Sequence, residues 1–157
     1  MSQSEHDKTV LDQFTKQAAP FAAAPIHQDG MELIRTAGRV TSTDDVLDVA
    51  CGPGLVACAI APYARHVTGI DMTPRMLDEA RAKAGRAGVT NVTWQIGTAS
   101  PLPYENESFT VVVTRYSFHH FADPAAALRE MFRVCRTGGR VVVVDLSIPA
   151  PQGLRFD

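Results

Sequence analysis

Residues 45–54 read DVLDVACGPG, an apolar run that holds one acid, Asp48, and ends at two glycines, Gly52 and Gly54. The apolar part predicts a buried strand, and glycines directly after a strand are typical of a tight turn into a helix beside a ligand site. The stretch leaves two kinds of ligand open. One is the phosphate groups of a dinucleotide, and the other is a group that carries positive charge.

Strand and helix patterns alternate on the carboxyl side of this stretch. Strands are expected at 46–51, 66–71, 91–97, 109–116 and 140–146. Helices are expected at 55–64, from Thr73-Pro74 to Gly88, and from Asp123-Pro124 to Gly138-Gly139. Strand and helix order with short connections predicts an α/β fold with right-handed crossovers.

The apolar patterns of these segments indicate which faces are buried. The valine runs at 111–113 and 141–144 are continuous rather than alternating, as in strands that are covered on both faces of a parallel sheet. The last helix carries an apolar stripe made of Leu128, Met131, Phe132 and Cys135. We therefore expect an open, mainly parallel sheet of about five strands with helices on both faces.

The first 38 residues read as an alanine-rich helical region, with breaks expected at Pro20 and Pro25. A helix is expected to end near Gly38. The chain is accordingly divided into an N-terminal helical segment, residues 1–40, and a ligand-binding core, residues 41–157.

Bulk composition excludes several classes of protein. The chain has 157 residues, of which 45% are hydrophobic and 20% charged, and its net charge is −2. This balance is that of one globular domain and predicts no nucleic-acid partner. No apolar stretch is long enough to span a membrane, and the polar N-terminus does not resemble a signal peptide. Three scattered cysteines fit neither a disulfide framework nor a metal site, so we expect a cytoplasmic protein without a metal.

The residue spacing of the glycine loop matches the dinucleotide-binding fingerprint. Gly52, Gly54 and Ala57 match G-x-G-x-x-G/A, and Asp71 stands 17 residues after Gly54 as the acid that binds ribose hydroxyls. Asp48 argues against a dinucleotide, because a carboxylate at the strand end would repel a pyrophosphate bound at the next helix. It would attract ammonium and sulfonium charges instead, which S-adenosylmethionine combines with an adenosine for Asp71. A plain strand-to-helix turn, with Asp48 bracing the loop, is the alternative.

As a set, the motifs resemble those of class I S-adenosylmethionine-dependent methyltransferases, most closely the group around the ubiquinone and menaquinone biosynthesis C-methyltransferases. The similarity is carried by VLDVACGPG at 46–54, VTGIDMT at 67–73, IGTASPLPYENESFTVVVTRYSFHHF at 96–121 and ALREMFRVCRTGGRVVVVD at 127–145. These segments cover most of the chain in the family's order and spacing. The resemblance implies a Rossmann-like fold, S-adenosylmethionine as cofactor and methyl transfer to a small-molecule acceptor.

The resemblance also implies roles for the matching positions. The residues implied on the methionine side of the cofactor are Asp48, Cys51, Gly52 and Gly54. Those implied around the adenosine are Asp71 at both ribose hydroxyls, Met72 on the adenine ring, and Thr98 and Ala99 at the adenine edge. Those implied near the sulfonium and its methyl group are Arg115 and Tyr116, with Phe14 closing over the cofactor as part of a lid.

No residue is assigned as the catalytic base, and the candidates are His119, His120 and Tyr116. Neighbouring histidines in a turn are expected to point apart, which argues against a shared metal ion.

The chain departs from the family pattern in two ways. Thr98 stands where the family has an acid that binds the adenine amino group, so weaker or altered adenine binding is expected. The chain also ends just after the fifth strand, without the family's sixth and seventh strands and the substrate-binding elements found there. We expect a fragment of a longer methyltransferase, whose fifth strand is an exposed edge through which a homodimer would form.

Three functions stay open on the sequence alone. The preferred one is an S-adenosylmethionine-dependent methyltransferase that acts on a small molecule. The second is a non-catalytic S-adenosylmethionine-binding module, a truncated core without an acceptor pocket. The third, an NAD-dependent oxidoreductase, is disfavoured by Asp48.

Overall fold

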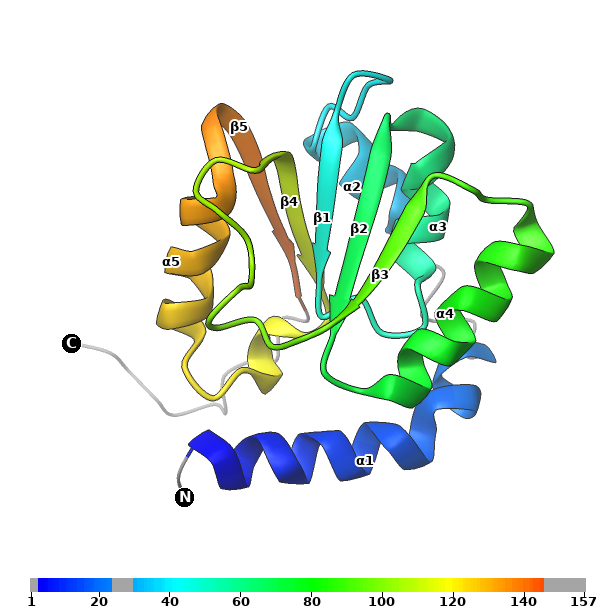
Figure 1. Cartoon of the computed structure of the whole chain (residues 1–157), viewed down its shortest axis with the longest axis vertical. Helices are drawn as coiled ribbons and strands as arrows, with labels where there is room; N and C mark the ends of the chain where they lie inside the picture. Colours follow the sequence, from blue (N-terminus) through cyan, green and yellow to red (C-terminus); the bar gives the residue numbers. More distant parts are fainter. Residues whose placement is uncertain (1–2, 24–29, 146–157) are drawn as a thin grey trace, which may run out of the picture.

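The computed structural model of the chain describes residues 3–23 and 30–145, which form a single parallel sheet flanked by helices (Figure 1). The strands are β1 Asp45–Val49, β2 His66–Asp71, β3 Val92–Ile96, β4 Phe109–Arg115 and β5 Cys135–Val144. The helices are α1 Gln3–Ala23, α2 Met31–Ala37, α3 Leu55–Ile60, α4 Pro74–Ala87 and α5 Pro124–Val134, with short 3₁₀ turns at Ala61–Tyr63 and Phe118–His120. The predicted Rossmann-like α/β fold is confirmed.

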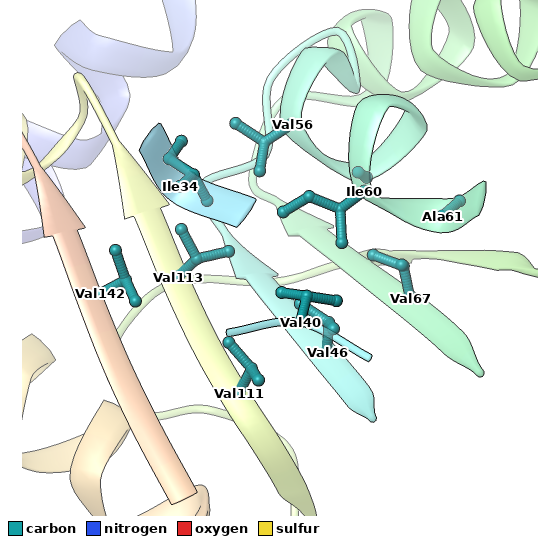
Figure 2. Close-up of a cluster of buried hydrophobic side chains, with 11 residues drawn as sticks. Ile34, Val40, Val46, Val56, Ile60, Ala61, Val67, Val111, Val113 and Val142 are labelled. Atoms are coloured by element: carbon teal, nitrogen blue, oxygen red, sulfur yellow. The ribbon is translucent and has the colours of Figure 1, made fainter. Parts of the chain in front are cut away.

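Consecutive residues of the central strands are buried on opposite faces of the sheet. Val46 of β1 and Val113 of β4 pack against Ile34 of α2 and Val56 of α3, as Figure 2 shows. Leu47, the next residue of β1, packs on the other face, where Met131 of α5 lies. Both faces of the central strands are therefore covered, as the valine run at 111–113 predicts. For the run at 141–144 the expectation is wrong in part, because β5 is an edge strand and Val143 is 40% exposed.

The strand order β3-β2-β1-β4-β5 places β4 beside β1, so the direction in which strands are added reverses between these two. Residue pairing in this part of the sheet sets Asp48 opposite Val113. Ligands of open α/β sheets bind at the carboxyl ends of the strands near such a reversal. In Figure 1, helix α1 runs across these carboxyl ends.

Two expected helix boundaries differ from the structure. Helix α1 continues past Pro20 to Ala23. A proline removes one backbone hydrogen bond, and the hydrogen bonds of the other turns are sufficient to maintain this helix. Pro25 lies outside the described residues. Helix α5 ends at Val134 rather than at Gly138-Gly139, since Cys135 is already extended and pairs with Phe109 of β4. The two glycines instead form the irregular start of β5, where Gly138 has a φ of 79°.

The apolar stripe predicted for α5 is also partly wrong. Met131 of the stripe is fully buried, but Phe132 is 61% exposed. The side of α5 that faces the sheet is formed by Ala127, Met131 and Val134. Ala127 has a small side chain that gives little apolar signal in the sequence. The buried face includes it and leaves Phe132 outside.

Candidate functional site

A pocket opens at the carboxyl ends of β1, β2 and β4, the place that the topology favours for a ligand. Its lining comes from five parts of the chain. The lining residues used below are Asp7, Val10, Phe14, Asp48, Ala50, Cys51, Gly52, Asp71, Met72, Met76, Thr98, Ala99, Arg115, Tyr116, Ser117, His120, Phe121 and Asp123.

The chain turns sharply where it leaves β1 and β4 to form this pocket. Ala50 and Tyr116 have φ values of 55° and 53°, a left-handed conformation that costs about 1 kcal/mol or more in residues with a side chain. The Ser117 hydroxyl donates hydrogen bonds to the Ala50 carbonyl at 3.4 Å and to the Arg115 carbonyl at 3.1 Å. The turns after the two strands are thereby joined at the mouth of the pocket.

Asp71, at the end of β2, organises the backbone of two turns. Its Oδ2 accepts a hydrogen bond from the Gly52 N–H and its Oδ1 one from the Thr73 N–H, each at 2.8 Å. Burial raises the pKa of the Asp71 carboxyl, against the lowering effect of these hydrogen bonds. Each carboxylate oxygen has a further lone pair, so Asp71 has the capacity to accept two more hydrogen bonds from a ligand.

Asp48, at the end of β1, is a more deeply buried acid, with 1% of its surface exposed. Its Oδ2 accepts a hydrogen bond from the Ala57 N–H of α3 at 3.1 Å. Burial, reinforced by the neighbouring Asp71, raises the pKa of Asp48 to about 8. Without a ligand, most of this carboxyl is therefore protonated at pH 7, and a cation placed beside it would favour its ionised form.

The two glycines of the loop have different structural roles. A Cβ on Gly52 would have only the Met76 sulfur nearby, at 4.0 Å, so the absent side chain leaves open space beside the pocket. A Cβ on Gly54 would lie 2.6 Å from the Trp94 ring and 2.9 Å from the Ala80 Cβ. Gly54, with a φ of 77°, is therefore required for packing of the loop over Trp94 of β3.

Arg115 ends β4 and is buried, with 8% of its surface exposed. Its guanidinium stacks on the Tyr116 ring, 4.3 Å from the ring centroid, and Nη1 lies 4.0 Å from the Met31 sulfur. Within the described part of the chain, its Nε and Nη2 atoms are buried without a hydrogen-bond partner. Buried polar groups without a partner are rare, and here they belong to a residue that lines the pocket.

Helix α1 closes the pocket from the side opposite the sheet. Asp7, Val10 and Phe14 line it at spacings of three and four residues, which is one face of a helix. The Phe14 ring meets the His120 ring edge to face at 5.2 Å, and His6 Nε2 lies 2.7 Å from the His120 carbonyl oxygen. The N-terminal helix is thus held on the core through the turn that follows β4.

The adjacent histidines do not point apart as expected. Their ring centroids lie 4.0 Å apart in a tilted arrangement, because the 3₁₀ turn Phe118–His120 brings them to the same side. His119 Nδ1 lies 2.6 Å from Asp145 Oδ1, which holds this ring outside the pocket lining. Burial and the neighbouring His119 lower the pKa of His120, which does line the pocket.

The structure brings most of the predicted site residues together. Every predicted cofactor residue except Gly54 lines the pocket, and among the catalytic candidates Tyr116 and His120 do so while His119 does not. The Thr98 hydroxyl donates to the Ser100 carbonyl at 3.2 Å. Among the lining residues that sequence reasoning missed are Asp7, Val10, Ser117, Phe121 and Asp123. Of these, Asp7 and Val10 had a signal, their helical spacing to Phe14.

Among the described helices, none has the length and apolarity needed to cross a membrane.

Comparison with known proteins assigns this arrangement to a family. A family profile described as methyltransferase domain matches residues 47–143. YcgJ of Bacillus subtilis, an uncharacterized methyltransferase, is 37% identical over 139 residues, which are 87% of this chain and 54% of that protein. The demethylmenaquinone methyltransferase of Deinococcus radiodurans is 42% identical over 107 residues, 67% of this chain and 44% of that enzyme. The chain thus spans about half the length of the curated relatives it matches.

Solved structures agree on the fold. The crystal structure of YcgJ from Bacillus subtilis superposes with a TM-score of 0.72 at 37% identity, covering 76% of this chain and 50% of that one. The phosphoethanolamine N-methyltransferase 1 of Haemonchus contortus, determined with phosphoethanolamine and S-adenosylhomocysteine, gives a TM-score of 0.78 at 20% identity, covering 99% of this chain and 35% of that one. The second likeness supports the fold alone.

Proposed function

The chain belongs to the methyltransferase domain family, and from this premise we propose that it binds S-adenosylmethionine and transfers the methyl group to a small-molecule acceptor. The observation that carries the proposal is the pair of buried acids, Asp48 and Asp71, on the two sides of the Gly52 turn in one pocket. Asp48 disfavours the phosphates of a dinucleotide, and the two acids together favour a ligand with a ribose diol and a cationic end. S-adenosylmethionine has both features and lacks phosphate.

The side chains of the pocket fit this ligand in shape and in hydrogen-bonding capacity. Asp71 retains acceptor sites for the two ribose hydroxyls, as described above. Gly52 leaves open space where any other residue would place a side chain. Met72, Thr98 and Ala99 follow β2 and β3 on the side where the adenine would lie.

The chain's contribution to the reaction is position and exclusion of water. S-adenosylmethionine supplies an activated methyl group on a positively charged sulfur when it is bound. Phe14 of α1 and Tyr116 after β4 would enclose the reacting end of the pocket, and holding two reactants in line is worth several kcal/mol. For an acceptor that arrives protonated, His120 is placed to accept the proton, because its lowered pKa leaves it neutral at pH 7.

The acceptor to test first is a quinol, since the Deinococcus relative is named demethylmenaquinone methyltransferase. A cytoplasmic location and a homodimer formed through the edge of β5 stay predictions.

A non-catalytic S-adenosylmethionine-binding module is the second candidate. The pocket residues described above fit the cofactor, and none of them is assigned to an acceptor. The two candidates share the cofactor and differ only in methyl transfer.

Calorimetric titration of the chain with S-adenosylhomocysteine, with NAD in a parallel experiment, tests the cofactor. We expect micromolar binding of S-adenosylhomocysteine and none of NAD. Asp71→Asn is expected to weaken binding about 100-fold, because the ribose loses a charged acceptor. Asp78→Asn, which changes an exposed carboxyl on α4, is the matched control and leaves binding unchanged. A folded chain that binds NAD, or binds neither ligand, contradicts the proposal.

Transfer of a radiolabelled methyl group separates the two candidates. A chain that binds S-adenosylhomocysteine and labels a short-chain demethylmenaquinol analogue is an enzyme. A chain that binds the cofactor equally well but labels none of a panel of phenols, quinols and amines fits the module.

A further inference from the structure

The pocket contains an arginine whose charge is not neutralised by the chain. Arg115 is 92% buried by the exposure given above, and its Nε and Nη2 atoms have no partner among the described residues. The contacts that it does make, with the Tyr116 ring and the Met31 sulfur, involve neutral groups. A guanidinium has five N–H donors in a fixed plane, and a carboxylate fits this plane with two parallel hydrogen bonds.

The register of the sheet places Arg115 on the same face as Asp48. Asp48 of β1 is paired with Val113 of β4, and residues two apart along a strand point to the same side. Val46 and Val113 both point toward α2 and α3 in Figure 2, so Asp48 and Arg115, two residues further along each strand, share that side of the pocket. This side also holds the Gly52 turn and the start of α3.

Asp48 and Arg115 are nonetheless not joined in an ion pair within the described part of the chain. Asp48 accepts its hydrogen bond from the Ala57 N–H, and Arg115 only lowers its pKa from a distance. A buried carboxyl that a cation would ionise and a buried guanidinium without a hydrogen-bond partner at Nε and Nη2 among the residues described, on one side of the pocket, are complementary to a ligand that carries both an ammonium and a carboxylate. An amino-acid group, with its ammonium and carboxylate on one carbon, is such a ligand.

We propose that Arg115 binds the α-carboxylate of the cofactor's methionine moiety, on the same side of the pocket where Asp48 meets its ammonium group. This inference rests on the proposed function and changes the role that the sequence resemblance implies for Arg115. A guanidinium directed at the sulfonium would bring two positive charges together without water between them, whereas a guanidinium on the carboxylate satisfies the unpaired N–H groups. Arg115 is then the residue that distinguishes an intact methionine end from a ligand without a carboxylate.

The test compares two ligands that differ in this one group. The ligands are S-adenosylhomocysteine and its decarboxylated analogue, 5′-deoxy-5′-(3-aminopropylthio)adenosine, each titrated calorimetrically into the full 157-residue chain. The wild type is expected to prefer S-adenosylhomocysteine by about 10- to 100-fold. Arg115→Met should remove this preference, weakening S-adenosylhomocysteine while binding of the analogue changes less than about threefold. Arg115→Lys, which keeps the charge but loses the planar donors, should retain part of the preference.

Arg65→Met is the matched control, because Arg65 pairs with Asp45 at the opposite end of the sheet. It should leave the ligand preference intact. An Arg115→Met chain that keeps the wild-type preference, whether its affinities for the two ligands stay the same or fall together, overturns the role of Arg115 while the proposed cofactor stands. A folded wild-type chain that binds neither ligand overturns the inference together with the proposed function.

Discussion

A buried acid lies at each end of strand β1, and the two acids differ in their ion-pair partners. At the amino end, Asp44 forms an ion pair with Arg140 at 2.7 Å and accepts hydrogen bonds from the N–H and hydroxyl of Thr41. At the carboxyl end, Asp48 accepts one backbone hydrogen bond and has no ion pair with a described residue. The charges that hold the fold are neutralised within the chain, whereas under the proposed function those beside the pocket would be neutralised by the cofactor.

The pKa values of the two acids follow the same division. Burial raises the pKa of Asp44, but hydrogen bonds from Thr110, Thr41 and Arg140 outweigh it, so the net pKa is lowered. Burial dominates at Asp48, whose pKa rises to about 8. An ionised Asp44 therefore stabilises the fold, and an ionised Asp48 destabilises it until a cationic ligand arrives.

The largest loss of stability among the proposed variants is expected from Asp44→Asn. This change leaves Arg140 without its ion-pair partner and should lower the free energy of unfolding by about 3 kcal/mol at pH 7. Because the pKa of Asp44 is lowered in the fold, its stabilisation is present above the ordinary carboxyl range and is lost as pH falls through the folded value. Urea unfolding at pH 7 and pH 3 should show a larger deficit at the higher pH. Binding of S-adenosylhomocysteine to the folded variant should be unchanged, and a loss of binding would contradict the division between the two ends.

Asp48→Asn is expected to have the opposite signature. The wild type should lose stability as pH rises from about 4 to about 8, by about 1.4 kcal/mol per pH unit at most, because the folded state holds the Asp48 proton that the unfolded state releases. The variant lacks this slope, so its stability relative to the wild type should increase with pH and become constant above pH 8. Denaturant unfolding across this range measures the slope.

Asp78→Asn on the exposed face of α4 serves as the control and should leave the wild-type slope in place. The Asp48→Asn variant should also bind S-adenosylhomocysteine about 10- to 100-fold more weakly. A variant with the wild-type pH slope would show that Asp48 is not the buried proton acceptor.

The sequence predicts the fold and the location of the site because both depend on local patterns. The continuous valine run at 111–113 predicts a strand covered on both faces, and DVLDVACGPG predicts a strand and the turn that leads into the next helix. The prediction of which face of α5 is buried was partly wrong, because this face depends on where Ala127 and Phe132 lie relative to the sheet. Alanine and phenylalanine fit either position until the register of β4 and β5 is known.

The sequence also could not predict that Asp48 and Arg115 form no ion pair with a described residue. Asp44, Asp48 and Arg115 are all charged residues within or next to apolar runs, and nothing local distinguishes a charge with a partner from one without. Pairing is decided by contacts between distant segments, such as Arg140 of β5 with Asp44 before β1. The role of α1 as a wall of the pocket, apart from Phe14, is a tertiary feature of the same kind.

Proton release on binding is the most direct test of why Asp48 has no ion-pair partner among the described residues. At pH 7 the free Asp48 carboxyl is mostly protonated, so a cationic ligand that ionises it should release close to one proton per site. Calorimetric titrations with S-adenosylhomocysteine in phosphate and in Tris differ in buffer ionisation heat and count this proton. The affinity should rise with pH by up to tenfold per unit between pH 6 and pH 8 and then level off, since above pH 8 no proton remains to be expelled. Asp48→Asn should bind without proton release, and a proton count near zero in the wild type would mean that Asp48 stays neutral beside the ligand and that its burial serves packing instead.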